Sequence, residues 1–379
     1  MFEYQRNNRY FTQISDELKE IGIEELENQK AWDIQPAYRG IYFKANPESL
    51  YSINYNSRYL TRILAPLISF KCHDDSYLYR KAREVKWSEI FRVNNSFAVF
   101  ASVNHSRITH SQYAALRLKD AIADYFRDSK GKRPSVNPKN PDVWINLYIE
   151  RNQATISLDT SGGSLHKRGY RKVTGQTPMQ ETVAAAMIRF SEWNGQKPLY
   201  DPMCGSGTLL CEALMCFCRI PSGLLRPRFG FQFLPDFNRE LWVEVKQRAD
   251  NDLQPFHPGI IGGSDISKNS VKSARENMEK LPHGQEVELR VCDFNEIPDL
   301  SDKTIICNPP YGIRTGSKEI AQKIYKEFGD FLKRKCQGSE AYVYFGDRKL
   351  IPAIGLRPAW KKSLRNGGLD GRLAKFEIY

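Results

Sequence analysis

The chain has 379 residues, 41% hydrophobic and 12% aromatic, a composition that excludes a disordered protein and a length that favours two or three domains. Its apolar runs, such as 183–188 and 213–218, are far shorter than the roughly 20 residues that cross a bilayer. The N-terminus lacks the basic patch and apolar stretch of a secretory signal, so we expect a cytoplasmic protein without membrane contact.

The formal net charge of +12 favours a polyanionic partner. Residues 51–175 hold 21 Lys and Arg against 10 Asp and Glu, whereas residues 1–50 hold 6 against 9. A solvated basic surface without a partner would give the same imbalance. None of the eight cysteines forms a Cys-x-x-Cys pair or has zinc-ligand spacing, so we expect reduced thiols and no metal.

Residues 1–60 predict a small ferredoxin-like α+β subdomain. Alternation and aromatic content predict strands over 9–14 and 38–44, and polar helical segments begin at Ser15 and at Pro47.

Residues 61–163 predict a second α+β unit. An apolar run occupies 63–68 and a strand-like run occupies 96–103, helical spacing covers 76–85 and 111–126, and a hairpin is predicted over 143–159. The Thr-Ser-Gly-Gly-Ser stretch at 160–164 interrupts regular structure, and 164–177 is expected to be a basic linker. From 178 to 379, apolar strands alternate with helices, which is typical of an α/β layer fold with a parallel sheet.

The first candidate site follows the predicted strand that ends at Asp201. It is a glycine-rich turn, Pro202-Met203-Cys204-Gly205-Ser206-Gly207, from which a helix begins at Thr208. Glycines at a strand-to-helix turn let a ligand approach the backbone closely.

Three later strands also end in polar residues. The second ends at Asp265, followed by Ile266, and the third ends in the pair Asp293-Phe294. The fourth leads into the loop Asn308-Pro309-Pro310-Tyr311. Open α/β sheets bind ligands at the carboxyl ends of their strands, so these residues are expected to line one site. Asp265 suits a ribose diol, and the Asp-Phe pair suits the amine and ring face of adenine. Asp265 as a helix cap and Asp293 as a turn acid are the structural alternatives.

The Asn308 loop suits methylation of an aromatic amine. The lone pair of such an amine is delocalised into its ring, and two acceptors aimed at its N–H groups favour a pyramidal nitrogen. The side-chain oxygen of Asn308 and the carbonyl of Pro309 can be these acceptors, held in place by the stiff pair Pro309-Pro310. Tyr311 offers a ring on which an extruded base can stack. This chemistry requires no metal.

Two pairs of motifs carry a family resemblance. Residues 201–208 and 308–312 resemble the Rossmann-like amino-methyltransferases of nucleic acids. The stretches Leu-His-Lys-Arg-Gly-Tyr-Arg at 165–171 and Asn-Gly-Gly-Leu-Asp-Gly-Arg-Leu at 366–373 are similar to THUMP-domain RNA methyltransferases related to the bacterial 23S rRNA guanine-N2 enzyme. Unlike the double enzymes of that group, this chain ends after one catalytic domain, and an insertion separates Asp201 from Asp265.

The resemblance implies a Rossmann-like class I methyltransferase domain preceded by a ferredoxin-like and THUMP RNA-binding region. It implies S-adenosyl-L-methionine as cofactor, and structured RNA, with 23S rRNA or a ribosome assembly intermediate favoured, as partner. The loop residues 308–311 would be catalytic, and Lys167, Arg168 and Arg171 would contact RNA. The expected cofactor-binding residues are Asp201, Pro202, Met203, Cys204, Gly205, Gly207, Thr208, Asp265, Ile266, Asp293, Phe294 and Asn308.

Several alternatives remain open from the sequence. The amine could be guanine N2 of tRNA or adenine N6 of a nucleic acid, because the same loop serves each. Glutamine methylation in proteins uses a similar loop, although the basic N-terminal half argues against it. A catalytically inactive RNA-binding protein is the alternative from another class.

Overall fold

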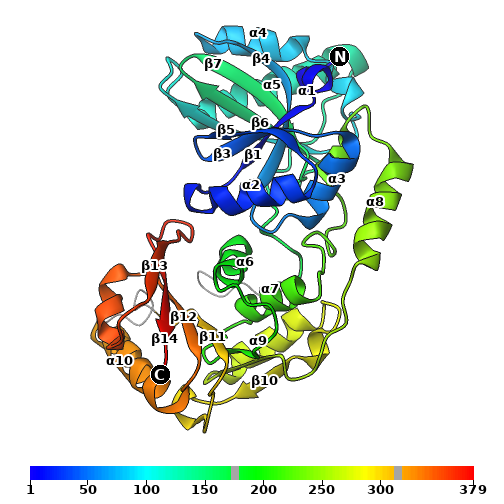
Figure 1. Cartoon of the computed structure of the whole chain (residues 1–379). Helices are drawn as coiled ribbons and strands as arrows, with labels where there is room; N and C mark the ends of the chain where they lie inside the picture. The colour runs from blue at the N-terminus through cyan, green and yellow to red at the C-terminus, as the bar shows by residue number, and fades with distance from the viewer. Residues whose placement is uncertain (172–178, 311–317) are drawn as a thin grey trace. The chain divides into compact units, whose positions relative to one another are not determined.

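The computed structural model describes residues 1–171, 179–310 and 318–379, which form two compact units. Unit 1 comprises residues 1–165 together with 226–247, and unit 2 comprises residues 166–225 together with 248–379 (Figure 1).

Unit 1 is built on a seven-stranded sheet with the order β2-β3-β1-β4-β7-β6-β5. Its neighbouring strands are antiparallel except for β5 and β6, which are parallel. The strands are β1 (Arg9–Gln13), β2 (Trp32–Ala37), β3 (Gly40–Lys44), β4 (Arg62–Lys71), β5 (Phe97–Asn104), β6 (Val143–Glu150) and β7 (Gln153–Asp159). The two N-terminal regions expected from the sequence, 1–60 and 61–163, therefore share one continuous sheet, in which β1 pairs with β4.

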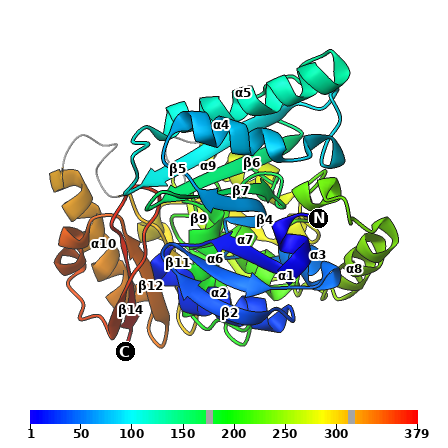
Figure 2. The same cartoon turned by 90° about the horizontal axis from the view of Figure 1, so that it is seen from above.

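Four helices of unit 1 lie where the sequence predicts helical segments, whereas the short helix at Glu3–Asn7 was not predicted. The helices of this unit are α1 (Glu3–Asn7), α2 (Lys19–Asn28), α3 (Pro47–Asn56), α4 (Asp75–Glu84), α5 (Ser111–Lys130) and, from the later segment, α8 (Arg239–Asn251), of which the last residues belong to unit 2. In α5, the residues Ala114, Leu118, Ala121, Ile122 and Phe126 are buried. Their spacing of three and four residues puts them on one helix face, which explains why this stretch is an amphipathic helix. The view from above shows α4 and α5 side by side (Figure 2).

The segment 226–247 corrects one expected boundary. The sequence placed it in the catalytic domain, 178–379, but it belongs to unit 1. The ring of Phe231 stacks on Tyr51 of α3 with 4.6 Å between centroids, and Trp242 lies 5.3 Å from Tyr55. Aromatic side chains bury large apolar areas. This aromatic cluster therefore explains why the segment packs in unit 1, although the residues before and after it belong to unit 2.

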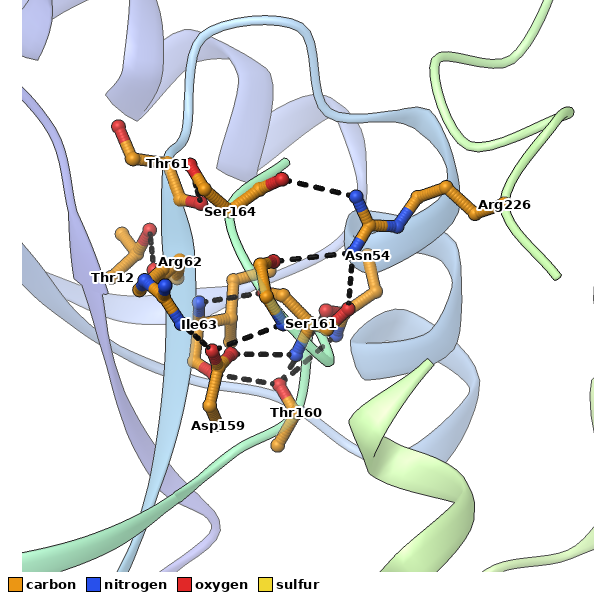
Figure 3. A network of polar contacts seen from close by, with 11 residues as sticks. Thr12, Asn54, Thr61, Arg62, Ile63, Asp159, Thr160, Ser161, Ser164 and Arg226 are labelled. Atoms are coloured by element: carbon orange, nitrogen blue, oxygen red, sulfur yellow. Dashed lines mark hydrogen bonds and ion pairs between the residues drawn. The ribbon is translucent and has the colours of Figure 1, made fainter. Parts of the chain in front are cut away.

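The Gly-Ser break at 160–164 is an ordered turn rather than a loose connection (Figure 3). The fully buried carboxylate of Asp159 forms an ion pair with Arg62 and accepts the backbone N–H of Ser161 at 3.0 Å. Arg226 donates to the carbonyls of Ser161 at 2.8 Å and Ser164 at 3.0 Å. The guanidinium of the later segment thus satisfies carbonyls that a buried turn would otherwise leave unpaired.

Unit 2 is a second seven-stranded sheet with the order β10-β9-β8-β11-β12-β14-β13. Strands β10, β9, β8, β11 and β12 are parallel, and β14 and β13 are antiparallel additions at one edge. The strands are β8 (Leu199–Asp201), β9 (Ile261–Asp265), β10 (Glu288–Val291), β11 (Thr304–Cys307), β12 (Glu340–Phe345), β13 (Trp360–Ser363) and β14 (Arg372–Glu377).

Helices cover this sheet on both sides, as the α/β prediction requires. They are α6 (Glu181–Phe190), α7 (Thr208–Phe217), α9 (Lys268–Met278) and α10 (Lys318–Lys335). Tyr325, Phe328 and Leu332 of α10 are buried in one cluster with Ile305 of β11 and Val343 of β12. Figure 1 shows α6 and α7 on the opposite side of these strands from α10. The expected class I methyltransferase architecture is confirmed.

No helix in the described part of the chain is long and apolar enough to cross a membrane.

Candidate active site

The four strand ends singled out from the sequence meet at one edge of the unit 2 sheet. Asp201 and Asp265 are the last residues of β8 and β9, Asp293 follows β10, and Asn308 directly follows β11. These four strands are parallel and adjacent, so their carboxyl ends lie in the order β10, β9, β8, β11. The structure therefore brings together the acids, the glycine turn and the start of the Asn-Pro-Pro loop.

Hydrogen bonds to β9 hold the glycine turn in place. The backbone N–H of Cys204 donates to the carbonyl of Ser264 at 2.9 Å, and that of Gly205 donates to the Asp265 carboxylate at 2.9 Å. Gly207 has a positive φ of 79°, and a Cβ there would lie 3.0 Å from the Cβ of Ala274 on α9. Gly205 also has a positive φ, but an added Cβ would meet nothing within 4 Å. One glycine thus allows close helix packing, whereas the other leaves open space at the turn.

Asp265 ends β9 with both carboxylate oxygens oriented by the backbone. Oδ2 accepts from the N–H of Gly205 and Oδ1 from the N–H of Ser267, each at 2.9 Å. A carboxylate has about four acceptor positions, and the described residues fill two of them, which leaves two for a ligand. The next residue, Ile266, has 70% of its surface exposed. An oriented acid beside an exposed aliphatic side chain matches the polar and apolar parts of a nucleoside.

Asp201 is different because it is buried. Its side chain accepts the N–H of Met203 at 3.1 Å and has 1% of its surface exposed. Burial raises the pKa of this carboxyl well above its usual value, and the negative charge of Asp265 contributes in the same direction. Burial likewise raises the pKa of the Cys204 thiol, so this cysteine is a protonated packing residue and not a nucleophile.

Asp293 and Phe294 have different surroundings. Asp293 accepts the N–H of Asn295 at 2.9 Å at the start of a short 3₁₀ turn, as the turn-acid alternative predicts, and it remains partly exposed at the site edge. The ring of Phe294 packs into the core, with centroids 5.6 Å from both Phe328 and Phe331. The core of unit 2 thus holds this ring in place, and its contact with an adenine face stays a prediction.

Asn308 has an unsatisfied acceptor. Its Oδ1 atom is buried and has no hydrogen-bond partner among the described residues. The following Pro309 is buried and Pro310 is exposed. Buried polar atoms are nearly always hydrogen-bonded, so an orphan acceptor at the ligand-binding edge of the sheet indicates that a donor arrives with a ligand. Tyr311, expected to stack on the base, lies outside the described residues.

The basic segment before the catalytic domain is mostly a structural element. Arg168 has 1% of its surface exposed, and its guanidinium contacts the fully buried Glu212 of α7 at 3.4 Å. Tyr170, also buried, donates its hydroxyl to Glu212 at 3.0 Å. The prediction that Arg168 contacts RNA is wrong, because a buried guanidinium paired with a carboxylate cannot reach a phosphate. Lys167 is exposed, as an RNA contact requires.

Arg171 also turns inward. It donates to the Thr208 hydroxyl at 2.9 Å and to the Met179 carbonyl at 3.0 Å, and it lies 3.5 Å from the Glu181 carboxylate. Thr208 begins the helix that follows the glycine turn, so Arg171 supports the turn from behind and is not an RNA contact. The rest of the expected linker, 172–177, and Pro178 lie outside the described residues.

Sequence reasoning missed Glu212, Tyr170 and Glu181. Glu212 could have been found, because it is a lone acid within the apolar run Leu-Leu-Cys-Glu-Ala-Leu at 209–214. A charged residue at a helix position that must be buried requires a partner of opposite charge.

The residues at the edge fit S-adenosylmethionine. Gly205 leaves room over the turn, Asp265 keeps free acceptor positions for hydroxyls, and Ile266 exposes an apolar surface. Among the described residues, no group of three or more His, Cys, Asp or Glu could hold a metal ion. The fold and this edge together define a class I, S-adenosylmethionine-dependent methyltransferase.

Comparison with known proteins identifies the family. Residues 168–375 match the family described as "RMKL-like, methyltransferase domain", and residues 72–159 match the THUMP domain. The chain therefore belongs to the RMKL-like methyltransferases and carries a THUMP domain. The expectation from the sequence motifs is confirmed.

Three relatives agree with this assignment. The chain is 35% identical over 371 residues to a Synechocystis sp. protein named "Putative RNA methyltransferase", covering 98% of this chain and 97% of that protein. It is also 35% identical to a "Ribosomal RNA large subunit methyltransferase K/L" of Syntrophotalea carbinolica, covering 96% of this chain but only 52% of that longer protein. The solved structure of SMU.472 with S-adenosylhomocysteine has a TM-score of 0.84 and 25% identity, and covers 98% of each chain.

Proposed function

We propose that this protein transfers a methyl group from S-adenosylmethionine to an exocyclic amine on a base of structured RNA, with guanine N2 of 23S rRNA as the favoured target. The single observation that carries the proposal is the buried Oδ1 of Asn308, which follows β11 at the ligand-binding edge and has no hydrogen-bond partner among the described residues. An amine that docks there supplies the missing donor.

The chemistry follows from the electronic structure of the amine. Its lone pair is conjugated with the ring and is weakly nucleophilic. When Asn308 Oδ1 accepts one of its N–H groups, a pyramidal nitrogen is favoured and the lone pair turns toward the cofactor. The cofactor supplies a sulfonium-bound methyl group that needs chiefly alignment to be transferred. Because Pro309 and Pro310 restrict the backbone, the acceptor is already in place when the base arrives.

The cofactor contacts are assigned to the residues at the neighbouring strand ends. The two remaining acceptor positions of Asp265 suit the ribose hydroxyls, Ile266 suits one face of the adenine, and Asp293 suits its amine. The open space beside Gly205 suits the part of the cofactor that crosses the glycine turn. Asp201 and Thr208 act indirectly, by holding that turn in its conformation.

The RNA assignment is supported by the THUMP domain and by the basic residues of 51–175. The target base is supported by the name of one relative, an rRNA large subunit methyltransferase, of which this chain spans about half the length. Mass spectrometry of rRNA and tRNA nucleosides from cells with and without the protein distinguishes guanine N2 from adenine N6, and rRNA from tRNA.

The mechanism is tested by Asn308→Ala in single-turnover methyl transfer with saturating cofactor. A preorganised polar contact of this kind contributes about 100- to 1,000-fold in rate, so we expect a loss of that size with little change in cofactor affinity. The matched control is Asn295→Ala, because Asn295 is an exposed asparagine that follows β10, which is not adjacent to β11 in the sheet. If Asn308→Ala keeps near wild-type turnover, the catalytic centre lies elsewhere.

A further inference from the structure

The C-terminal part of unit 2 contains a stretch with basic residues and no acids. Residues 348–369, here called the basic strip, contain six Lys and Arg and no Asp or Glu. All six side chains are exposed: Arg348, Lys349, Arg357, Lys361, Lys362 and Arg365. Residues 51–175 hold most of the excess positive charge, so this strip is a second basic region, within unit 2.

One end of the strip lies at the edge of the unit 2 sheet that carries Asn308, here called the methyl-transfer edge. Strand β12 runs parallel to β11, with Val343 paired to Cys307, so the end of β12 lies at the same edge as Asn308. Arg348 follows β12 closely. Phe345, the last residue of β12, pairs with Arg372 of β14, which in turn pairs with Ser363 of β13. The turn 364–371, which carries Arg365, therefore projects from that same edge.

The turn is held in one conformation. Leu364 is buried; its N–H donates to the Gly371 carbonyl at 3.0 Å, and its carbonyl accepts the Tyr344 hydroxyl at 3.1 Å. Asn366 is buried as well and accepts the N–H of Gln180 at 3.0 Å. Arg365 stands between these two anchored residues with its side chain exposed. A cation presented from an ordered turn loses less entropy on binding than one on a mobile loop.

The Asp370 carboxylate lies close enough to several cations for their charges to act on it. Hydrogen bonding with Arg372 lowers the pKa of the Asp370 carboxyl, and the charges of Arg348 and Arg365 act on it in the same direction. Arg348 follows the end of β12 and Arg365 follows the end of β13, so both residues lie at the same edge of the sheet although they are separated in sequence. Asp370 forms its ion pair with Arg372 at 2.7 Å, so the local charge stays positive.

We propose that Arg348, Lys349 and Arg365 bind the phosphates of the RNA strand that flanks the target nucleotide. The inference rests on the proposed function and extends it from the base to the backbone on either side. A base that enters the Asn308 site brings its neighbouring phosphates to this edge, and Arg and Lys are the side chains that neutralise phosphates. The charge is thus complementary to the one polyanion that must approach this place.

The test compares two double variants that each remove two positive charges. Arg348→Ser with Arg365→Ser removes cations at the methyl-transfer edge. Arg357→Ser with Lys335→Ser removes exposed cations at the other end of the strands, since Arg357 precedes β13 and the Lys335 carbonyl binds the Leu300 N–H before β11 begins. Each phosphate contact contributes about 0.7–0.9 to the slope of log affinity against log salt, so the first pair should lower the slope by about 1.4–1.8. The second pair should leave it unchanged.

Three further measurements separate the outcomes. Affinity for S-adenosylhomocysteine should be unchanged in both double variants, which shows that the fold is intact. The first pair should raise KM for RNA by a larger factor than it lowers kcat, and replacing both arginines by lysine should restore the slope. Equal salt slopes in the two double variants would overturn the inference. RNA binding like that of the wild type by the Arg348→Ser and Arg365→Ser double variant would also overturn it. That second result is expected if the strip instead binds an acidic protein. Failure of the wild-type protein to methylate any RNA would instead refute the proposed function.

Discussion

Lys167 and Arg168 are adjacent cations for which the structure predicts opposite consequences of removal. Lys167 is exposed, whereas Arg168 is buried against Glu212 and Tyr170. We compare Lys167→Met with Arg168→Met, because both changes remove one positive charge and leave a flexible apolar side chain. If these cations act together as an RNA-binding run, the two variants should behave alike.

The magnitude follows from the burial of the pair. Arg168→Met leaves the Glu212 carboxylate, which has no exposed surface, with the Tyr170 hydroxyl but no cation. Removing one partner of a buried ion pair costs about 3–5 kcal/mol of unfolding free energy. For a unit of this size that is a fall of about 6–20 °C in Tm. Lys167→Met should change Tm by less than about 2 °C, since exposed substitutions stay within about 0.5 kcal/mol.

Thermal unfolding followed by circular dichroism gives the first readout, and the salt dependence of RNA binding gives the second. We expect Arg168→Met to lower Tm and leave the salt slope unchanged. Replacing both members, as Arg168→Met with Glu212→Gln, should recover part of the loss because no buried charge is then unpaired. A normal Tm for Arg168→Met together with a reduced salt slope would refute the buried pair and restore Arg168 as an RNA contact.

Three other predictions concern the cofactor edge. Asp265→Ala should weaken S-adenosylhomocysteine binding in calorimetry while RNA affinity is retained, and an unchanged cofactor Kd would exclude the ribose contact. Thr208→Val and Arg171→Met should each raise KM for the cofactor but not for RNA, and the double variant should be no worse than the more impaired single variant; additive losses would show that the two side chains act separately. Burial raises the pKa of Asp201 above its usual 3.8, so the folded state holds this proton more tightly than the unfolded chain, and stability falls as pH rises above that value. Asp201→Asn should therefore reduce the fall in Tm of the cofactor-free protein between pH 4 and neutral pH, and an unaltered pH profile would contradict the raised pKa.

The sequence alone determined which strand ends carry the candidate site residues. Alternating apolar strands and helices predict a parallel sheet, and a parallel sheet puts the carboxyl ends of its strands at one edge. Asp201, Asp265 and Asn308 could therefore be assigned to one site without coordinates, because their positions depend only on strand direction and adjacency. The family motifs also predicted the cofactor, because each motif is a short run of consecutive residues that can be recognised without coordinates.

Only the tertiary structure decided which side chains face inward. A run of cations at 167–171 looks like a ligand for RNA until Glu212, 44 residues after Arg168, is found buried beside it. The ring of Phe294 directly follows Asp293 in the sequence, but it packs against two rings of α10, a helix later in the chain. The segment 226–247 lies within the methyltransferase sequence, yet its aromatic side chains pack with α3 of unit 1. Burial depends on contacts between residues distant in sequence, and local patterns do not contain that information.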